Sequence, residues 1–137
     1  MRKIFDYPSP RAHYRNEQAF LWCSDQRFEG VHRAFMSNHW FQNADPIIIP
    51  GGVKNLVTPK FPRDTDFILE QIELLMGHGF RELYAMAHND CAACGGNTDP
   101  AYYEDLLRSA AEVIRARISG LKVYPIYAAF DGLYLVE

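Results

Sequence analysis

Ala19-Phe20-Leu21-Trp22-Cys23 is an uninterrupted apolar run that stops at Ser24-Asp25. A short apolar run bounded by turn residues is typical of a strand buried on both faces of a sheet. Two further segments have the same character: Pro46-Ile47-Ile48-Ile49, and Leu83-Tyr84-Ala85-Met86-Ala87 before His88. The sequence therefore predicts three strands, of which the first and the third are buried.

A helix is predicted between the second and third of these strands. Apolar residues at positions 68, 72, 75 and 76 follow the i, i+4, i+7, i+8 spacing of an amphipathic helix. We expect it to begin at Asp64 or Thr65, which can cap it, and to end at Gly77 or Gly79. The stretch 28–41 has no clear period and allows a helical turn or two.

The last third of the chain predicts one more helix and a hairpin. Asp99 can cap a helix whose first residue is Pro100, and Gly120 can end it. A strand is expected over 123–129, and an Asp-Gly turn separates it from a short partner over 133–136.

Strands that alternate with amphipathic helices indicate right-handed βαβ units. We therefore expect one α/β domain over residues 1–137, with a mainly parallel sheet flanked by helices. Ligand sites in such folds form beyond the carboxyl ends of the strands. Cys23 and His88 each end a predicted strand, so both are expected at that edge.

Composition excludes several classes of protein. The formal net charge of −3 does not favour nucleic acid or an anionic membrane as a partner. Apolar runs of a few residues fall far short of the about 20 needed to span a bilayer, and the first 18 residues lack the apolar core of a signal peptide. Three cysteines are too few for a disulfide scaffold, so we expect a cytoplasmic protein with free thiols.

Two short motifs carry candidate chemistry. Cys23, Asp25 and Arg27 are spaced two apart, so an extended chain would project them from one face. His88 and Cys91 are three apart at a strand end, where a turn can aim both at one ion. Zn²⁺ prefers a tetrahedral shell, and two sulfurs with one nitrogen leave a fourth position for water. The pattern predicts a catalytic zinc site.

Other interpretations of the same residues remain open. Cys23 alone reads as a small core residue, and Asp25 with Arg27 as a surface ion pair. If Cys94 also bound the metal, a Cys₃His shell would be closed and structural. Cys91 and Cys94 could alternatively form a metal-free redox dithiol.

Together, Cys-x-Asp-x-Arg after one strand and His-x-x-Cys after another resemble the zinc signature of the β-class carbonic anhydrases. The resemblance covers residues 19–96. It implies reversible hydration of CO₂ to bicarbonate by zinc-bound hydroxide, or a related reaction of COS or CS₂, in a homodimer or larger homo-oligomer. The implied residues are the zinc ligands Cys23, His88 and Cys91 and the catalytic pair Asp25 and Arg27.

The substrate site is less defined by the sequence. A small apolar pocket could come from Phe20, Trp22 or Phe28, while His32 and His39 are unplaced candidates for a proton relay. The sequence also departs from the family pattern. The family's bicarbonate-binding glutamine has no clear match, Pro50-Gly51-Gly52 replaces a longer loop, and Ala92-Ala93-Cys94 separates Cys91 from the glycines that follow.

Overall fold

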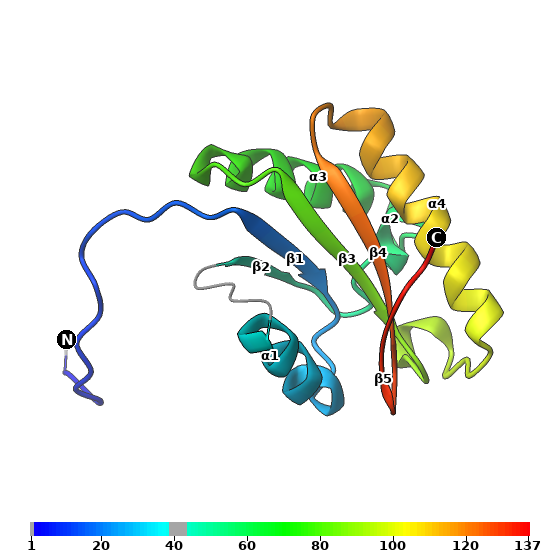
Figure 1. Ribbon diagram of the computed structural model, residues 1–137, viewed down its shortest axis with the longest axis horizontal. Coiled ribbons are helices and arrows are strands. Elements are labelled where there is room, and N and C mark those ends of the chain that lie inside the picture. Colours follow the sequence, from blue (N-terminus) through cyan, green and yellow to red (C-terminus); the bar gives the residue numbers. More distant parts are fainter. Residues whose placement is uncertain (1, 39–43) are drawn as a thin grey trace.

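The fold is built on a five-stranded sheet with the strand order β2-β1-β3-β4-β5. The computed structural model describes residues 2–38 and 44–137. Neighbouring strands are parallel except β5, which is antiparallel to β4 (Figure 1). The strands are β1 (Gln18–Trp22), β2 (Ala44–Ile48), β3 (Glu82–His88), β4 (Lys122–Ala129) and β5 (Gly132–Leu135). The predicted single-domain α/β fold with a mainly parallel sheet is confirmed.

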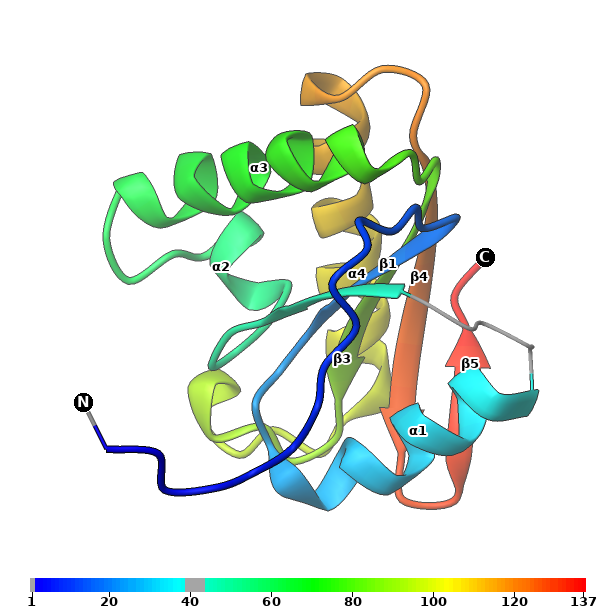
Figure 2. The ribbon, with the colours of Figure 1, turned by 90° about the vertical axis from the view of Figure 1, so that its left-hand side faces the viewer.

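Helices cover both faces of this sheet (Figures 1 and 2). The helix α1 (Glu29–Asn38) lies on one face, while α2 (Lys54–Val57), α3 (Arg63–Leu75) and α4 (Pro100–Arg117) pack on the other. Along β1, Leu21 joins the core beneath α2 to α4, and Phe20 joins the core beneath α1. This alternation explains why the strand is apolar at every position from Ala19 to Trp22. Within the described residues, no helix is long and apolar enough to cross a bilayer.

The two strands that follow β1 in the sequence, β2 and β3, lie on opposite sides of it. From β1 the chain passes through α1 to β2 on one side, and then through α2 and α3 to β3 on the other side. Such a switch opens a crevice at the carboxyl ends of the two neighbouring strands. Cys23 follows β1 directly and His88 ends β3, so both lie at this crevice as expected.

The helix ends differ in how well local sequence specifies them. Asp99 caps α4 as predicted, accepting a hydrogen bond of 3.0 Å from the Ala101 amide. The cap predicted for α3 is wrong: this helix begins at Arg63, and Asp64 accepts from the Phe61 amide instead. The ambiguous stretch contains a ten-residue helix, α1.

The two edge strands of the sheet are β2 and β5, and β2 contains a proline. At one edge, β2 contains Pro46, whose partner in the register with β1 is Phe20. Ile49, just after β2, donates its N–H to the carbonyl of Trp22 in β1. The backbone N–H and C=O groups of successive residues in a strand face opposite sides. Since Ile49 faces β1, Pro46, three residues earlier, turns its nitrogen to the outer side of the sheet. The other edge strand is β5.

Gly52 allows the loop after β2 to approach the end of β1. Its φ is +48°, and an added Cβ would lie 3.0 Å from the Cys23 nitrogen and 3.2 Å from the Trp22 carbonyl carbon. Only glycine adopts this conformation at such a close approach without strain. The glycine therefore fixes how the loop meets the strand that carries Cys23.

Gly52→Ala is expected to lower the free energy of unfolding by about 2 kcal/mol, because the methyl group must displace backbone atoms at a positive φ. Gly30→Ala is the matched control, since Gly30 has open space around its Cβ position and lies in α1. Chemical denaturation followed by circular dichroism measures both. Equal stability of the two variants would contradict the proposed close contact.

Candidate metal centre

Three of the residues singled out in the sequence converge in space. One ligand atom each from Cys23, His88 and Cys91 lies within 4.8 Å of the others. All three residues are buried, and two of them come from neighbouring parallel strands. The described part of the chain therefore contains a Cys-His-Cys group that could bind a metal ion.

His88 is oriented by its own turn. Its Nδ1 lies 2.8 Å from the carbonyl oxygen of Asn89, which can only accept, so Nδ1 carries the proton. Nε2 is then left with its lone pair, and this buried atom has no hydrogen-bond partner among the described residues. An orphaned imidazole nitrogen beside two thiols is what a metal site requires. The residues present fit a divalent cation.

Backbone and tyrosine groups contact the two cysteines. Gly51 donates its N–H to Cys23 Sγ over 3.2 Å, so the glycine loop supports one ligand directly. The Cys91 amide donates to the Tyr103 hydroxyl over 3.1 Å, and that hydroxyl donates to the Asn97 carbonyl over 2.7 Å. These contacts position both candidate ligand residues.

Without a cation the thiols interact with one another. The hydrogen bond with Cys91, together with burial, raises the pKa of Cys23 to about 12. A hydrogen bond from Cys91 lowers the pKa of Cys94 to about 7. A bound cation would instead favour the thiolate form of its ligands.

Cys94 lies beside the group without belonging to it. It is partly buried and contacts Cys91 and Tyr102, and a 3-10 turn over Ala92–Cys94 carries it past the ligand position. The three-donor group in the described residues does not include Cys94. The geometry therefore favours an open three-ligand site over a closed Cys₃His shell.

Asp25 and Arg27 form a close ion pair next to the group. The chain does not stay extended there, because Asp25 caps a 3-10 turn over Gln26–Phe28 and accepts from the Arg27 amide. The guanidinium folds back, donating from Nη2 to Asp25 Oδ2 over 2.7 Å and from Nε to Oδ1 over 3.0 Å. This pairing lowers the pKa of Asp25 to about 2. The carboxylate reaches within 3.8 Å of His88 Nε2.

A small cavity of about 110 Å³ opens beside the metal group. Cys23 and Asp25 line it together with Trp22, Ile48 and His32. Trp22, but not Phe20, lines this cavity, and Phe28 lines a separate one of about 200 Å³ with Arg27 and Phe130. A small molecule could reach the group from the first cavity.

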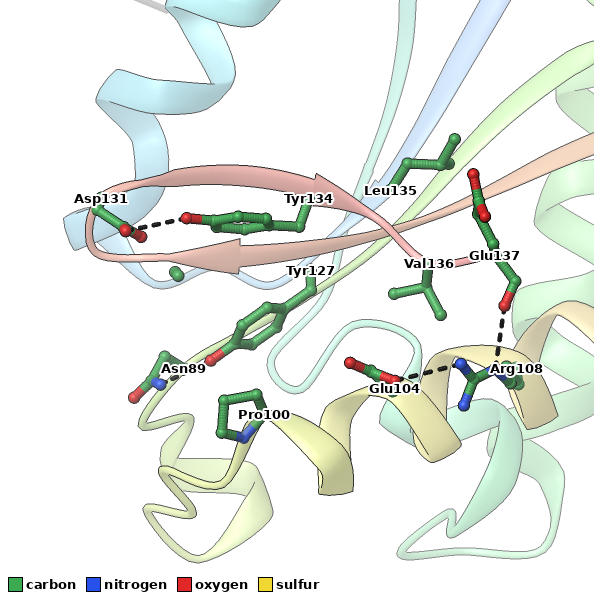
Figure 3. A pocket seen from close by; sticks show the side chains of 11 residues that line it. Asn89, Pro100, Glu104, Arg108, Tyr127, Asp131, Tyr134, Leu135, Val136 and Glu137 are labelled. Atoms are coloured by element: carbon green, nitrogen blue, oxygen red, sulfur yellow. Dashed lines mark hydrogen bonds and ion pairs between the residues drawn. The ribbon is translucent and has the colours of Figure 1, made fainter.

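A larger cavity of about 590 Å³ lies elsewhere, between α4 and the β4–β5 hairpin (Figure 3). Its polar groups are already paired: Arg108 with Glu104, and Tyr134 with Asp131. Asn89 connects this cavity to the metal group. Its side-chain amide donates to the Tyr127 hydroxyl, and its backbone carbonyl accepts from His88 Nδ1. It contains no cluster of ligand atoms in the described residues.

The remaining histidines fall in different places. His32, which the sequence left unplaced, packs between Phe20 and Trp22 and lines the small cavity. His78 Nδ1 lies 2.8 Å from Asp45 Oδ2, and His13 is exposed. His39 lies outside the described residues.

Sequence reasoning missed several supporting residues, including Asp90, Asn97 and Tyr103. Asn97 and Tyr103 meet Cys91 only through folding, so no local pattern marks them. Asp90 stands inside the His-x-x-Cys motif, and its position between two candidate ligands was the available signal.

The fold is that of the β-carbonic anhydrases, which confirms the resemblance at the level of architecture. A carbonic anhydrase from Streptococcus mutans superposes with a TM-score of 0.67 at 14% identity, over 96% of this chain and 88% of that one. The β-carbonic anhydrase isoform I of the protozoan Trichomonas vaginalis gives 0.59 at 13% identity, over 96% and 87%. No family model and no curated protein sequence matches the chain.

Cys91→Ser and Cys94→Ser form a matched pair of variants. Cys91→Ser is expected to lose bound metal, because it removes a donor atom from the group. Cys94→Ser is expected to keep one metal ion per chain. Elemental analysis after purification under reducing conditions measures both, and loss of metal in Cys94→Ser would show a four-ligand site.

Proposed function

We propose that this chain is a zinc lyase that reversibly hydrates CO₂ to bicarbonate. Cys23, His88 and Cys91 would hold the zinc, and Asp25 and Arg27 would act beside it. The observation that carries the proposal is the buried Cys-His-Cys group at the strand edge of a β-carbonic-anhydrase fold. Hydrolysis of COS or CS₂ would use the same residues.

The donor set supports zinc in particular. Two thiolates and a neutral imidazole are the ligand types that zinc takes in proteins, and three protein ligands are typical of its catalytic sites. Zinc bound by such a set lowers the pKa of water towards about 7 and thereby supplies a nucleophile at neutral pH.

Asp25 would orient the nucleophile. Its carboxylate is ionised at neutral pH and lies at the mouth of the group, so it can only accept a hydrogen bond there. A carboxylate in this place could also bind the metal and block it. Arg27 opposes that movement, because its paired donors engage both carboxylate oxygens.

The small cavity suits a small apolar substrate. Trp22 and Ile48 give it apolar walls, while Cys23 and Asp25 form the side next to the metal group. Its volume of about 110 Å³ leaves little space for larger ligands.

Stopped-flow measurement of CO₂ hydration by zinc-loaded protein tests the proposal. We expect a rate well above buffer, and Asp25→Asn is expected to lower kcat by about 100-fold, because it removes the charged acceptor. Asp105→Asn is the control, since Asp105 is an exposed partner of Arg108 on α4. A wild-type rate equal to buffer would overturn the proposal, and parallel assays with COS and CS₂ would identify an analogue hydrolase.

We also propose a homodimer or larger homo-oligomer. The segment before β1 extends away from the body of the molecule (Figure 1) and leaves large apolar side chains exposed, among them Ile4, Phe5 and Tyr7. Clustered apolar surface of this kind is typical of protein–protein contacts. The cytoplasmic location expected from the free cysteines stays a prediction.

Analytical ultracentrifugation is expected to show an oligomer for the full chain. Replacing Ile4 and Phe5 with Glu should weaken the assembly by at least tenfold in Kd, because charge would enter an apolar contact. Lys3→Glu is the control for an added acidic residue on the same segment. A monomeric full chain would contradict the proposal.

A further inference from the structure

Arg27 has a second carboxylate partner, Asp90. The guanidinium donates from Nη1 to Asp90 Oδ2 over 2.9 Å and from Nη2 to the Asp90 carbonyl over 3.0 Å. Asp90 stands between His88 and Cys91, whereas Arg27 and Asp25 follow Cys23. One arginine therefore joins the two loops that carry the proposed ligands.

The backbone places Asp90 for this contact. Its φ is +54°, in the left-handed region that residues other than glycine seldom adopt. Its N–H donates to the Asn97 carbonyl over 2.9 Å, which anchors the turn. Gly96 leaves space beside the carboxylate, since a Cβ there would lie 3.3 Å from Asp90 Oδ1. The strained turn aims the carboxylate at Arg27.

We propose that Asp90 is a positioning residue that holds Arg27 in the orientation in which it keeps Asp25 away from the metal. This inference rests on the proposed function. Asp90 acts through Arg27 and Asp25, and it touches neither the metal nor the substrate.

The planarity of the guanidinium explains why two carboxylates are needed. Asp25 accepts from the edge of the guanidinium that includes Nη2, and Asp90 accepts from Nη1, which lies outside that edge. The Arg27 side chain is 46% exposed, and its guanidinium carbon lies 5.9 and 5.7 Å from the ring centres of Phe28 and Phe130, which are cation–π contacts without a directed hydrogen bond. Without the Asp90 carboxylate the arginine would keep Asp25 and the backbone carbonyl of residue 90 as acceptors, but lose its charged partner on the His88–Cys91 loop, so that Arg27 and Asp25 could rotate together more freely.

The distance that Asp25 must travel is short. Its Oδ2 is already 3.8 Å from His88 Nε2, so a small rotation would bring it to a cation held by the group. Release of Arg27 would therefore favour a closed site, in which Asp25 competes with any external ligand.

The test measures azide binding to the Co²⁺-substituted protein by visible absorption, which reports whether the open position accepts an anion. Asp90→Asn keeps the side-chain shape and tolerates the left-handed turn, but removes the charge. We expect it to weaken azide binding about three- to fivefold, the size expected for a half-exposed ion pair. In an Asp25→Asn background the same change is expected to have no effect, because no charged competitor remains.

Asp105→Asn is the matched control and should leave azide affinity unchanged. Equal azide affinity in wild type and Asp90→Asn would overturn the inference, as would an equal loss in the Asp25→Asn background, which would indicate a merely structural role.

A second readout uses the metal-free protein and does not depend on the proposed function. The NMR resonance of the Arg27 Nε–H group should shift and broaden in Asp90→Asn, and remain unchanged in Asp105→Asn. Failure of the wild type to take up Co²⁺ would overturn the proposed function, and an unaltered Arg27 resonance would overturn the role of Asp90.

Discussion

Parallel pairing of β1 with β3 is the constraint on which the rest of the structure depends. It brings Cys23 and His88, far apart in the sequence, to one edge of the sheet. The pairing is held by the core beneath α2 to α4, where Leu21 and Ala85 are fully buried. The geometry of the metal group is thus a product of the apolar core, because a shift in register would separate the thiol from the imidazole.

Hydrogen bonds made in and near the turns at the strand ends support the same three residues. The glycine loop supports Cys23, Tyr103 supports Cys91, and the Asn89 carbonyl sets the proton position on His88. Gly51 and Asn89 supply backbone groups, whereas Tyr103 supplies its side-chain hydroxyl, so two of these three supports depend on the fold and not on side-chain identity. This agrees with a shared architecture at 13% to 14% identity.

The sequence was sufficient for elements with strong local signals. The apolar runs marked the interior strands, and Asp99 with Pro100 marked the start of α4, because these signals act within a few residues. Helix α1 could not be predicted from its sequence, because the residues that pack on the sheet, Val31 and Phe35, stand among polar neighbours and give no clear hydrophobic period. The Cys-His-Cys group that could bind a metal followed from motif spacing, whereas Asp90 and Tyr103 make their contacts with Arg27 and Cys91 only through folding.

The proline in β2 has a consequence for how the sheet can grow. Edge strands offer free N–H and C=O groups on which another chain can add a strand. Because Pro46 lacks an N–H on the outer side, this edge presents an interrupted row of donors. Continuous sheet extension is therefore disfavoured at β2, which leaves β5 as the edge more open to an intermolecular sheet.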